Sequence, residues 1–245
     1  NVPVNREGIV DSCLLILHDW SNAIALEDKE IDEERGVIRE EWRTRTNANM
    51  RILAKLIPQV FAGSQYANRM PIGTMDIVMN FPYQTLKDYY HKWYRPDLQG
   101  IIIVGDIDAD KTEKKLKEIF NTIPKPENAA ERIYYTVPDN KEPIIAIAKD
   151  KEATGSQVTV YYKHKPMTKE LKATIAGIAG IFLKSVTSMM LNDRLKEISE
   201  KTNAPFMSAY SYDANFIVSK TMDAFTTMAV SKEGETQKAL KALLQ

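Results

Sequence analysis

The sequence predicts an α+β fold in two layers, with a mainly antiparallel sheet packed against helices. Two observations support this fold class. Short segments that are apolar throughout or alternate with polar residues are typical of strands, and they occur at 98–107, 143–149, 156–163, 207–213 and 221–230. Stretches with apolar residues at helical spacing lie between several of them, and the last two segments follow each other as a hairpin would. This order favours an α+β arrangement over a doubly wound parallel sheet.

In the first half of the chain, apolar residues at helical spacing predict helices at 8–24, 83–93 and 110–121. Another helix is expected to begin near Asp28, which is a plausible N-cap, and to continue or restart as far as Val60. Residues 98–107 are expected to form a buried strand, because Ile101 to Val104 are all apolar. A Gly-Asp pair follows and ends the strand.

The second half begins after a polar connection that contains prolines, at about 124–132. A long helix is predicted at 168–200, and its repeated alanine and glycine residues, Gly177 and Gly180 among them, suggest close packing against a sheet. The final residues read as a helix that no cap or breaker ends. We therefore expect a fragment of a longer polypeptide, divided into domains at 1–125 and 126–245.

Composition excludes several classes of protein. Lysine plus arginine equals aspartate plus glutamate at 33 each, so no net positive charge favours nucleic acid or an anionic membrane as a partner. No run of 18 apolar residues predicts a membrane span. The single cysteine, Cys13, excludes an internal disulfide and is expected to be a buried structural thiol.

Familiar catalytic motifs are absent from these 245 residues. There is no phosphate-binding Gly-x-x-x-x-Gly-Lys, no Gly-x-Gly-x-x-Gly, no Gly-x-Ser-x-Gly and no Cys-x-x-Cys. The three histidines, His18, His91 and His164, lie 73 residues apart each time, so no two of them share a helical face by local spacing. Each is expected to be a solvated or capping residue, since a catalytic zinc site needs three protein ligands.

The informative segment is the predicted helix that carries Glu34 and Glu41. Seven steps of about 100° come to within about 20° of two full turns, so both carboxylates lie on one stripe of the helix. Glu40 lies about 120° away from that stripe. On spacing alone, a solvated charged face is the favoured interpretation of this segment, because charged residues surround both glutamates.

A family resemblance favours a functional role for this helix. The segment Glu34-Arg35-Gly36-Val37-Ile38-Arg39-Glu40-Glu41 has the form Glu-Arg-x-x-x-x-x-Glu. It resembles the insulinase and pitrilysin family of zinc peptidases, which includes the mitochondrial processing peptidases and carries His-x-x-Glu-His on an earlier helix. Pro71 to Thr74, Trp93 to Leu98 and Leu191 to Leu195 follow in the order that is characteristic of this family.

The resemblance implies both a fold and a site. The fold would be one metallohydrolase half of the processing peptidase type, with 1–125 as the C-terminal part of the catalytic domain and 126–245 as the following α+β domain. Glu41 would be the third zinc ligand, and Glu34 would support the site through hydrogen bonds. The cofactor would be zinc, the substrate a peptide or unfolded protein, and the partner a second half-domain of the same or another chain.

The chain departs from the family in one respect, because it contains no His-x-x-Glu-His. We therefore expect the parent to be a zinc metalloendopeptidase and the 245-residue chain alone to be inactive. Two alternatives stay open: a non-catalytic partner or structural subunit of the same family, and a generic α+β binding module in which both glutamates face solvent. A periplasmic or exported location is favoured, although no targeting segment is in view.

Overall fold

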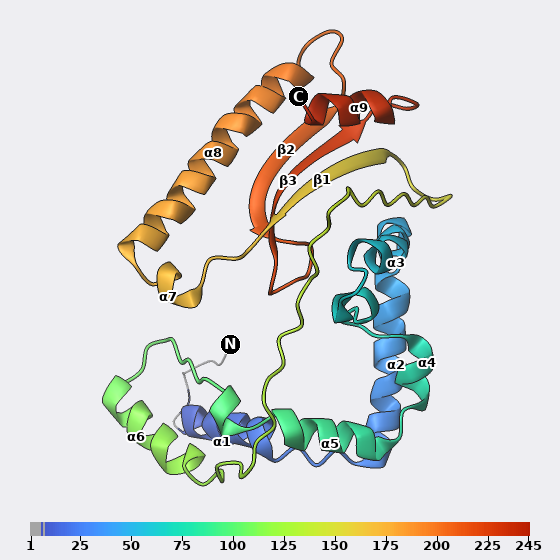
Figure 1. The fold of residues 1–245 in the computed structure, drawn as a ribbon. Helices are drawn as coiled ribbons and strands as arrows, with labels where there is room; N and C mark the ends of the chain where they lie inside the picture. Colours follow the sequence, from blue (N-terminus) through green and yellow to red (C-terminus); the bar gives the residue numbers. More distant parts are fainter. Residues whose placement is uncertain (1–5, 7) are drawn as a thin grey trace. The chain divides into compact units, whose positions relative to one another are not determined.

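The computed structural model describes residue 6 and residues 8–245, and the chain forms two compact units (Figure 1). Unit 1 comprises Asn1–Arg43 and Ile72–Arg132, and unit 2 comprises Thr44–Pro71 and Ile133–Gln245. The segment 44–71 thus groups with the C-terminal residues rather than with its neighbours in sequence. The division into functional domains at 1–125 and 126–245 stays a prediction.

Unit 1 is built from helices. They are α1 (Ile9–Asn22), most of α2 (Asp28–Arg45), α4 (Met75–Asn80), α5 (Tyr83–Trp93), η2 (Pro96–Leu98) and α6 (Ala109–Phe120). Of these, α1, α2, α5 and α6 lie at or near the positions that the sequence predicts. α1 packs against α6: Leu14 is buried, and the His18 ring meets the edge of Phe120 with centroids 5.7 Å apart. Cys13, expected to be buried, is half-buried.

The predicted strand at 98–107 is wrong. Residues 101–104 have no regular secondary structure, and the side chains of Ile102 and Val104 are 89% and 91% exposed. A strand needs a neighbour that accepts and donates its backbone hydrogen bonds. No described strand pairs with this segment, so its apolar residues take no part in a sheet. The predicted strand at 143–149 is wrong for the same reason, and Ile145 and Ile147 are largely exposed there.

Unit 2 contains a three-stranded antiparallel sheet in the order β1-β3-β2 (Figure 1). The strands are β1 (Ser156–His164), β2 (Ser208–Asn215) and β3 (Asp223–Ser231). β3 pairs with β1 from Asp223 to Ser231 and with β2 from Asp223 to Val230. The α+β fold class and its antiparallel sheet are thereby confirmed.

Helices α7 (Lys169–Lys172), α8 (Ile175–Ser199) and α9 (Thr236–Leu243) belong to the same unit, and α8 packs on β2. A buried cluster joins α8 and α9 to the sheet through Leu195, Phe206, Ala229 and Ala239. The predicted single helix at 168–200 is divided, because the Thr174 side chain accepts a hydrogen bond from the amide of Gly177 and caps a new helix.

The small residues of α8 do not pack against the sheet as expected. A Cβ on Gly177 would lie 1.9 Å from the backbone oxygen of Leu171, so this glycine permits the close approach of α7 instead. The beginning of α8 is open to solvent, and Ile175 is 87% exposed. Among the described residues α8 is the one helix long and apolar enough to cross a membrane by length and composition, which is weak evidence alone. Lys184 in its middle pairs with Asp213 of β2 at 2.8 Å.

The opposite end of the sheet packs with α3 (Ala48–Val60) and the 3₁₀ helix η1 (Gln65–Asn68). The buried cluster here comprises Ile57, Phe61, Val137, Phe216 and Ala224. The Phe61 and Phe216 ring centroids are 4.9 Å apart. This aromatic cluster fastens α3 to the sheet within unit 2.

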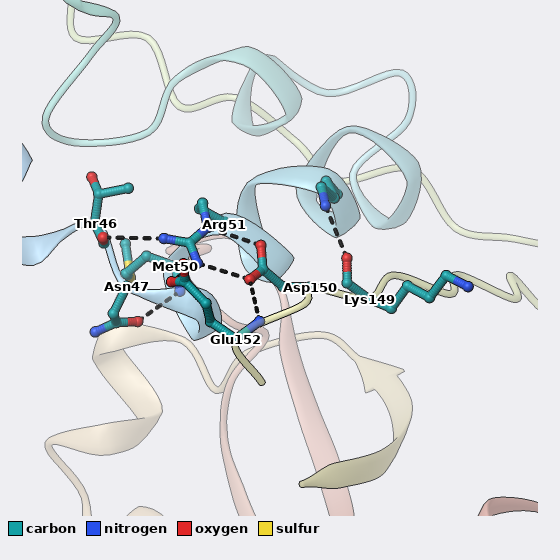
Figure 2. Close-up of polar contacts among 8 residues, drawn as sticks. Thr46, Asn47, Met50, Arg51, Lys149, Asp150 and Glu152 are labelled. Carbon is teal, nitrogen blue, oxygen red and sulfur yellow. Dashed lines mark hydrogen bonds and ion pairs between the residues drawn. The ribbon is translucent and has the colours of Figure 1, made fainter. Parts of the chain in front are cut away.

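An ion-pair network ties α3 to the segment before β1 (Figure 2). Arg51 donates to both carboxylate oxygens of Asp150, at 2.8 Å from Nε and 2.7 Å from Nη2. The same Nη2 reaches Glu152 at 2.6 Å, and Lys55 donates to the backbone oxygen of Lys149 at 2.9 Å. A two-pronged guanidinium–carboxylate pair fixes direction as well as distance, so 149–152 is held in one place on α3.

Asp150 should make the stability of unit 2 depend on pH. Hydrogen bonds from Arg51 hold the pKa of Asp150 well below its ordinary value of 3.8. A carboxyl whose pKa is lowered by folding stabilises the folded protein when the pH is above the ordinary pKa of that group. This contribution to the free energy of unfolding is lost as the pH falls from the ordinary pKa toward the lowered one. We expect Asp150→Asn to lower the free energy of unfolding most near pH 7, with the deficit shrinking below about pH 4.

The measurement is denaturant unfolding of both proteins between pH 3 and pH 7. Glu233→Gln is the control, because Glu233 is an exposed carboxylate of the same unit, and its small effect should not vary with pH. A deficit for Asp150→Asn that stays constant over this range would contradict the role given to the ion pair.

Candidate functional site

Helix α2 carries both predicted site residues on an uninterrupted backbone. It begins at Asp28, where Asp28 and Glu30 supply negative charge in the first turn, and it continues to Arg45. Ile31 and Arg35 are its buried residues and define the face that packs. The local sequence therefore forms one rigid element across the whole Glu-Arg-x-x-x-x-x-Glu segment.

Glu34 is exposed and Glu41 is half-buried. Because the helix is continuous between them, seven residues at about 1.5 Å each separate them by roughly 10 Å along one stripe. The structure thus places the two glutamates on one face of α2, as the spacing predicts. The metal-ligand role of Glu41 and the supporting role of Glu34 stay predictions.

Glu40, the neighbouring carboxylate, has a different environment. It accepts a 2.7 Å hydrogen bond from Nε of Arg43, three residues later on the same helix. This bond holds the pKa of Glu40 below its ordinary value. Glu40 therefore lies in a local surface ion pair, off the stripe of Glu34 and Glu41.

Arg35 is the residue that sequence reasoning missed. The sequence predicts a charged residue on a solvated face, whereas the structure leaves Arg35 only 6% exposed. It donates to the backbone oxygens of Val78 and Phe81, and its guanidinium lies 3.9 Å from the centroid of the Phe81 ring. One signal pointed to this position, because Arg35 follows the apolar Ile31 by four residues and so shares its face of the helix.

The hydrogen bonds of His18 and His164 are to residues other than Glu34 and Glu41. His18 contacts Asp19 and Thr122 at 3.1 Å each, and His91 is exposed near the end of α5. His164 ends β1 and contacts Asp213 at 3.0 Å. Within residue 6 and residues 8–245, no group of three or more histidine, cysteine, aspartate or glutamate side chains could hold a metal ion.

The donor set therefore does not fit a complete zinc site in the described part of the chain. A carboxylate on a rigid helix suits one of the ligand positions of a catalytic zinc, whose three protein ligands are drawn from histidine, glutamate, aspartate and cysteine. Glu41 can fill one such position. The described residues do not gather two further ligands around it, because no group of three such side chains is found among them.

Comparison with known proteins identifies relatives for nearly the whole chain. The family model described as "Peptidase M16 inactive domain" matches residues 80–245. A protein of Haemophilus influenzae named "Probable zinc protease PqqL" is 32% identical over 214 residues, which cover 86% of this chain and 23% of that protein. The "Zinc protease PQQL-like" of Arabidopsis thaliana is 30% identical over 220 residues, covering 89% of this chain and 23% of that protein.

A solved structure shares the arrangement of the chain as well. The first half of the periplasmic protease PqqL from Escherichia coli superposes with a TM-score of 0.77 at 25% identity, covering 98% of this chain and 50% of that one. The chain thus spans about a quarter of the length of the curated relatives it matches. Glu34 and Glu41 lie before the residues that the family model matches.

Proposed function

Because this chain belongs to the peptidase M16 family, we propose that it is part of a larger zinc-dependent endopeptidase and supplies Glu41 as the third zinc ligand. In this proposal the two histidine ligands and the general base come from a His-x-x-Glu-His segment outside these 245 residues. The relatives are named zinc proteases, which supports zinc and peptide hydrolysis as the chemistry of the parent.

One observation carries the proposal. Glu34 and Glu41 share one stripe of a continuous helix whose other face is buried and held by Arg35. A ligand helix needs this combination, since a metal site tolerates little movement of its ligands.

The chain's own residues would act by holding and orienting. Glu41 would bind the metal, and Glu34 would steady the site through outer hydrogen bonds. Zinc, when bound, supplies a cation that lowers the pKa of a bound water. The substrate would be a peptide or unfolded protein, enclosed with the help of a second half-domain. The periplasmic location of the Escherichia coli relative supports an exported location for this protein.

The proposal predicts a clear difference between the 245-residue chain and its parent. With zinc and a mixture of peptides, the chain alone should give no cleavage, because it supplies one ligand of three. The full-length polypeptide that contains these residues should cleave, lose activity with a chelator and regain it with added zinc. Robust hydrolysis by the purified 245-residue chain, or chelator-resistant cleavage by the parent, would contradict the proposal.

A second candidate is a non-catalytic subunit of the same family. The matching family model is described as an inactive domain, and this description favours a supporting role for residues 80–245. The two candidates differ in the parent's sequence. An intact His-x-x-Glu-His before Glu34 would support the endopeptidase, and a segment with eroded ligands would support the non-catalytic subunit.

A further inference from the structure

Each of the three guanidinium nitrogens of the buried Arg35 has a polar partner. Its Nε lies 3.0 Å from Oδ1 of Asp32, Nη1 donates to the oxygen of Val78 at 2.5 Å, and Nη2 donates to the oxygen of Phe81 at 2.7 Å. The Phe81 ring covers the guanidinium plane at 3.9 Å. A charge removed from water at this depth is stable only because its donors are satisfied in this way.

The two carbonyls that Arg35 reaches come from the C-terminal end of a helix. Val78 lies in the last turn of α4, and Phe81 is its C-cap. The last carbonyls of a helix have no partner within the helix, and α4 has no basic residue in its last turn. Arg35 supplies both hydrogen bonds from α2. A planar guanidinium can serve two carbonyls in fixed directions at once, whereas a lysine ammonium cannot match this geometry.

Two further contacts extend the attachment along the same face of α2. Oδ2 of Asp32 accepts a 2.6 Å hydrogen bond from the Tyr83 hydroxyl, and Asp28 pairs with Lys87 at 2.6 Å. The hydrogen bond from Tyr83, followed by that from Arg35, holds the pKa of Asp32 below its ordinary value. Seven helical steps, about two turns, separate Asp28 from Arg35. The contacts of Asp28, Asp32 and Arg35 therefore fix both the height and the rotation of α2 against the end of α4 and α5.

The glutamate stripe lies beside this anchored face. Viewed down the helix axis, Glu34 lies about 100° from Arg35, and Glu41 lies about 120° from Arg35 in the same direction of rotation. Any rotation of α2 about its axis therefore moves both carboxylates. A ligand constellation must be held to within about 0.5 Å, so a helix free to turn would spoil the site.

We propose that Arg35 is a positioning residue for the zinc site: through Val78, Phe81 and Asp32 it sets the rotation of α2 and hence the direction of Glu41. The inference rests on the proposed function of Glu41. It assigns to the arginine of the Glu-Arg-x-x-x-x-x-Glu segment a task that does not involve contact with the metal.

The test compares Arg35→Lys with Arg39→Lys in the full-length polypeptide. Arg39 is an exposed arginine on the same helix and serves as the matched control. The zinc dissociation constant is measured by competition with a chromogenic chelator, and the unfolding midpoint is measured for the zinc-free proteins. We expect Arg35→Lys to weaken zinc binding by about 10- to 100-fold, which is typical when residues that orient metal ligands are changed. Arg39→Lys should leave zinc affinity unchanged.

A purely structural role for Arg35 gives a different result. In that case Arg35→Lys lowers the unfolding midpoint while folded protein keeps the parent's zinc affinity, and the inference is overturned. If Arg35→Lys does not fold, Tyr83→Phe replaces it, because this change keeps the guanidinium and removes only the hydroxyl that holds Asp32. A loss of about tenfold in zinc affinity for Tyr83→Phe supports the inference, and unchanged affinity overturns it.

The outcome also separates this inference from the proposed function. If Glu41→Gln retains zinc as well as the parent does, Glu41 is not a ligand and the proposed function fails. If Glu41→Gln loses zinc while Arg35→Lys and Tyr83→Phe bind it at full strength, the ligand assignment stands and only the positioning role is wrong.

Discussion

Replacing Glu41 by glutamine in the full-length polypeptide should remove nearly all of its bound zinc and its peptidase activity. Glutamine keeps the size and shape of the side chain but replaces the anionic ligand by a neutral amide, which zinc binds poorly. Changes to residues that merely support a ligand cost about 10- to 100-fold in metal affinity, so loss of the ligand itself should cost more than about 100-fold. Zinc content after dialysis and peptide cleavage measure the two effects.

Glutamine substitutions at two other glutamates of α2 provide a control and an intermediate case for this result. Glu40→Gln is the matched control, since Glu40 is paired with Arg43 on the surface of the same helix, and its zinc content and activity should equal those of the parent. Glu34→Gln should fall between the two, with zinc affinity reduced by about tenfold, because Glu34 is assigned a supporting role. Full zinc content in Glu41→Gln, or loss of zinc in Glu40→Gln, would show that the ligand has been assigned to the wrong residue.

Replacing Phe61 by alanine should destabilise unit 2 by about 3–5 kcal/mol. Phe61 is fully buried, and its ring packs against Phe216 at 4.9 Å and Tyr66 at 5.5 Å. Truncation removes this aromatic packing and leaves a cavity that the rigid sheet beneath cannot fill. Denaturant unfolding of the 245-residue chain, followed by far-ultraviolet circular dichroism, measures the loss.

Phe182→Ala is the control for this change, because it removes the same side chain from α8 where 65% of the residue is exposed. Its effect on the free energy of unfolding should stay within about 0.5 kcal/mol. Equal losses for Phe61→Ala and Phe182→Ala would mean that the cluster around Phe61 does not hold α3 to the sheet.

Local pattern was sufficient to predict most of the helices. α5 has the predicted bounds, Tyr83–Trp93, because apolar residues repeat at helical spacing from the residue after Pro82 as far as Trp93. The three strands of the sheet were also located, since apolar and β-branched residues alternate with polar ones or gather in short runs there. β3 is the clearest case. These features depend on residues close in sequence, and a pattern of neighbours carries that information.

Features that depend on distant residues were not predictable in this way. The segments 98–107 and 143–149 are as apolar as true strands, but strand formation also requires a partner, which the apolar pattern cannot reveal. The burial of Arg35 depends on the carbonyls of Val78 and Phe81, more than 40 residues away. The Arg51–Asp150 pair joins residues 99 apart. Charged residues in such pairs look the same in sequence as those on a solvated surface.

Part of the candidate site followed from spacing and part did not. The seven-residue interval predicted that Glu34 and Glu41 share a stripe, and the unbroken helix α2 places them so. The choice of Glu41 as a ligand came from the family resemblance, since the spacing treats both residues alike. The described residues bring together no group of three or more potential metal ligands, so the assignment of a complete zinc site depends on the parent.

The central claim is that Glu41 binds the catalytic zinc of the parent, and anomalous diffraction at the zinc absorption edge tests it most directly. Crystals of the full-length polypeptide should show one strong anomalous peak about 2.0–2.2 Å from a carboxylate oxygen of Glu41, with two histidine nitrogens completing the protein ligands. A zinc peak that is absent from this position, or that lies on Glu40 or another carboxylate, would contradict the account.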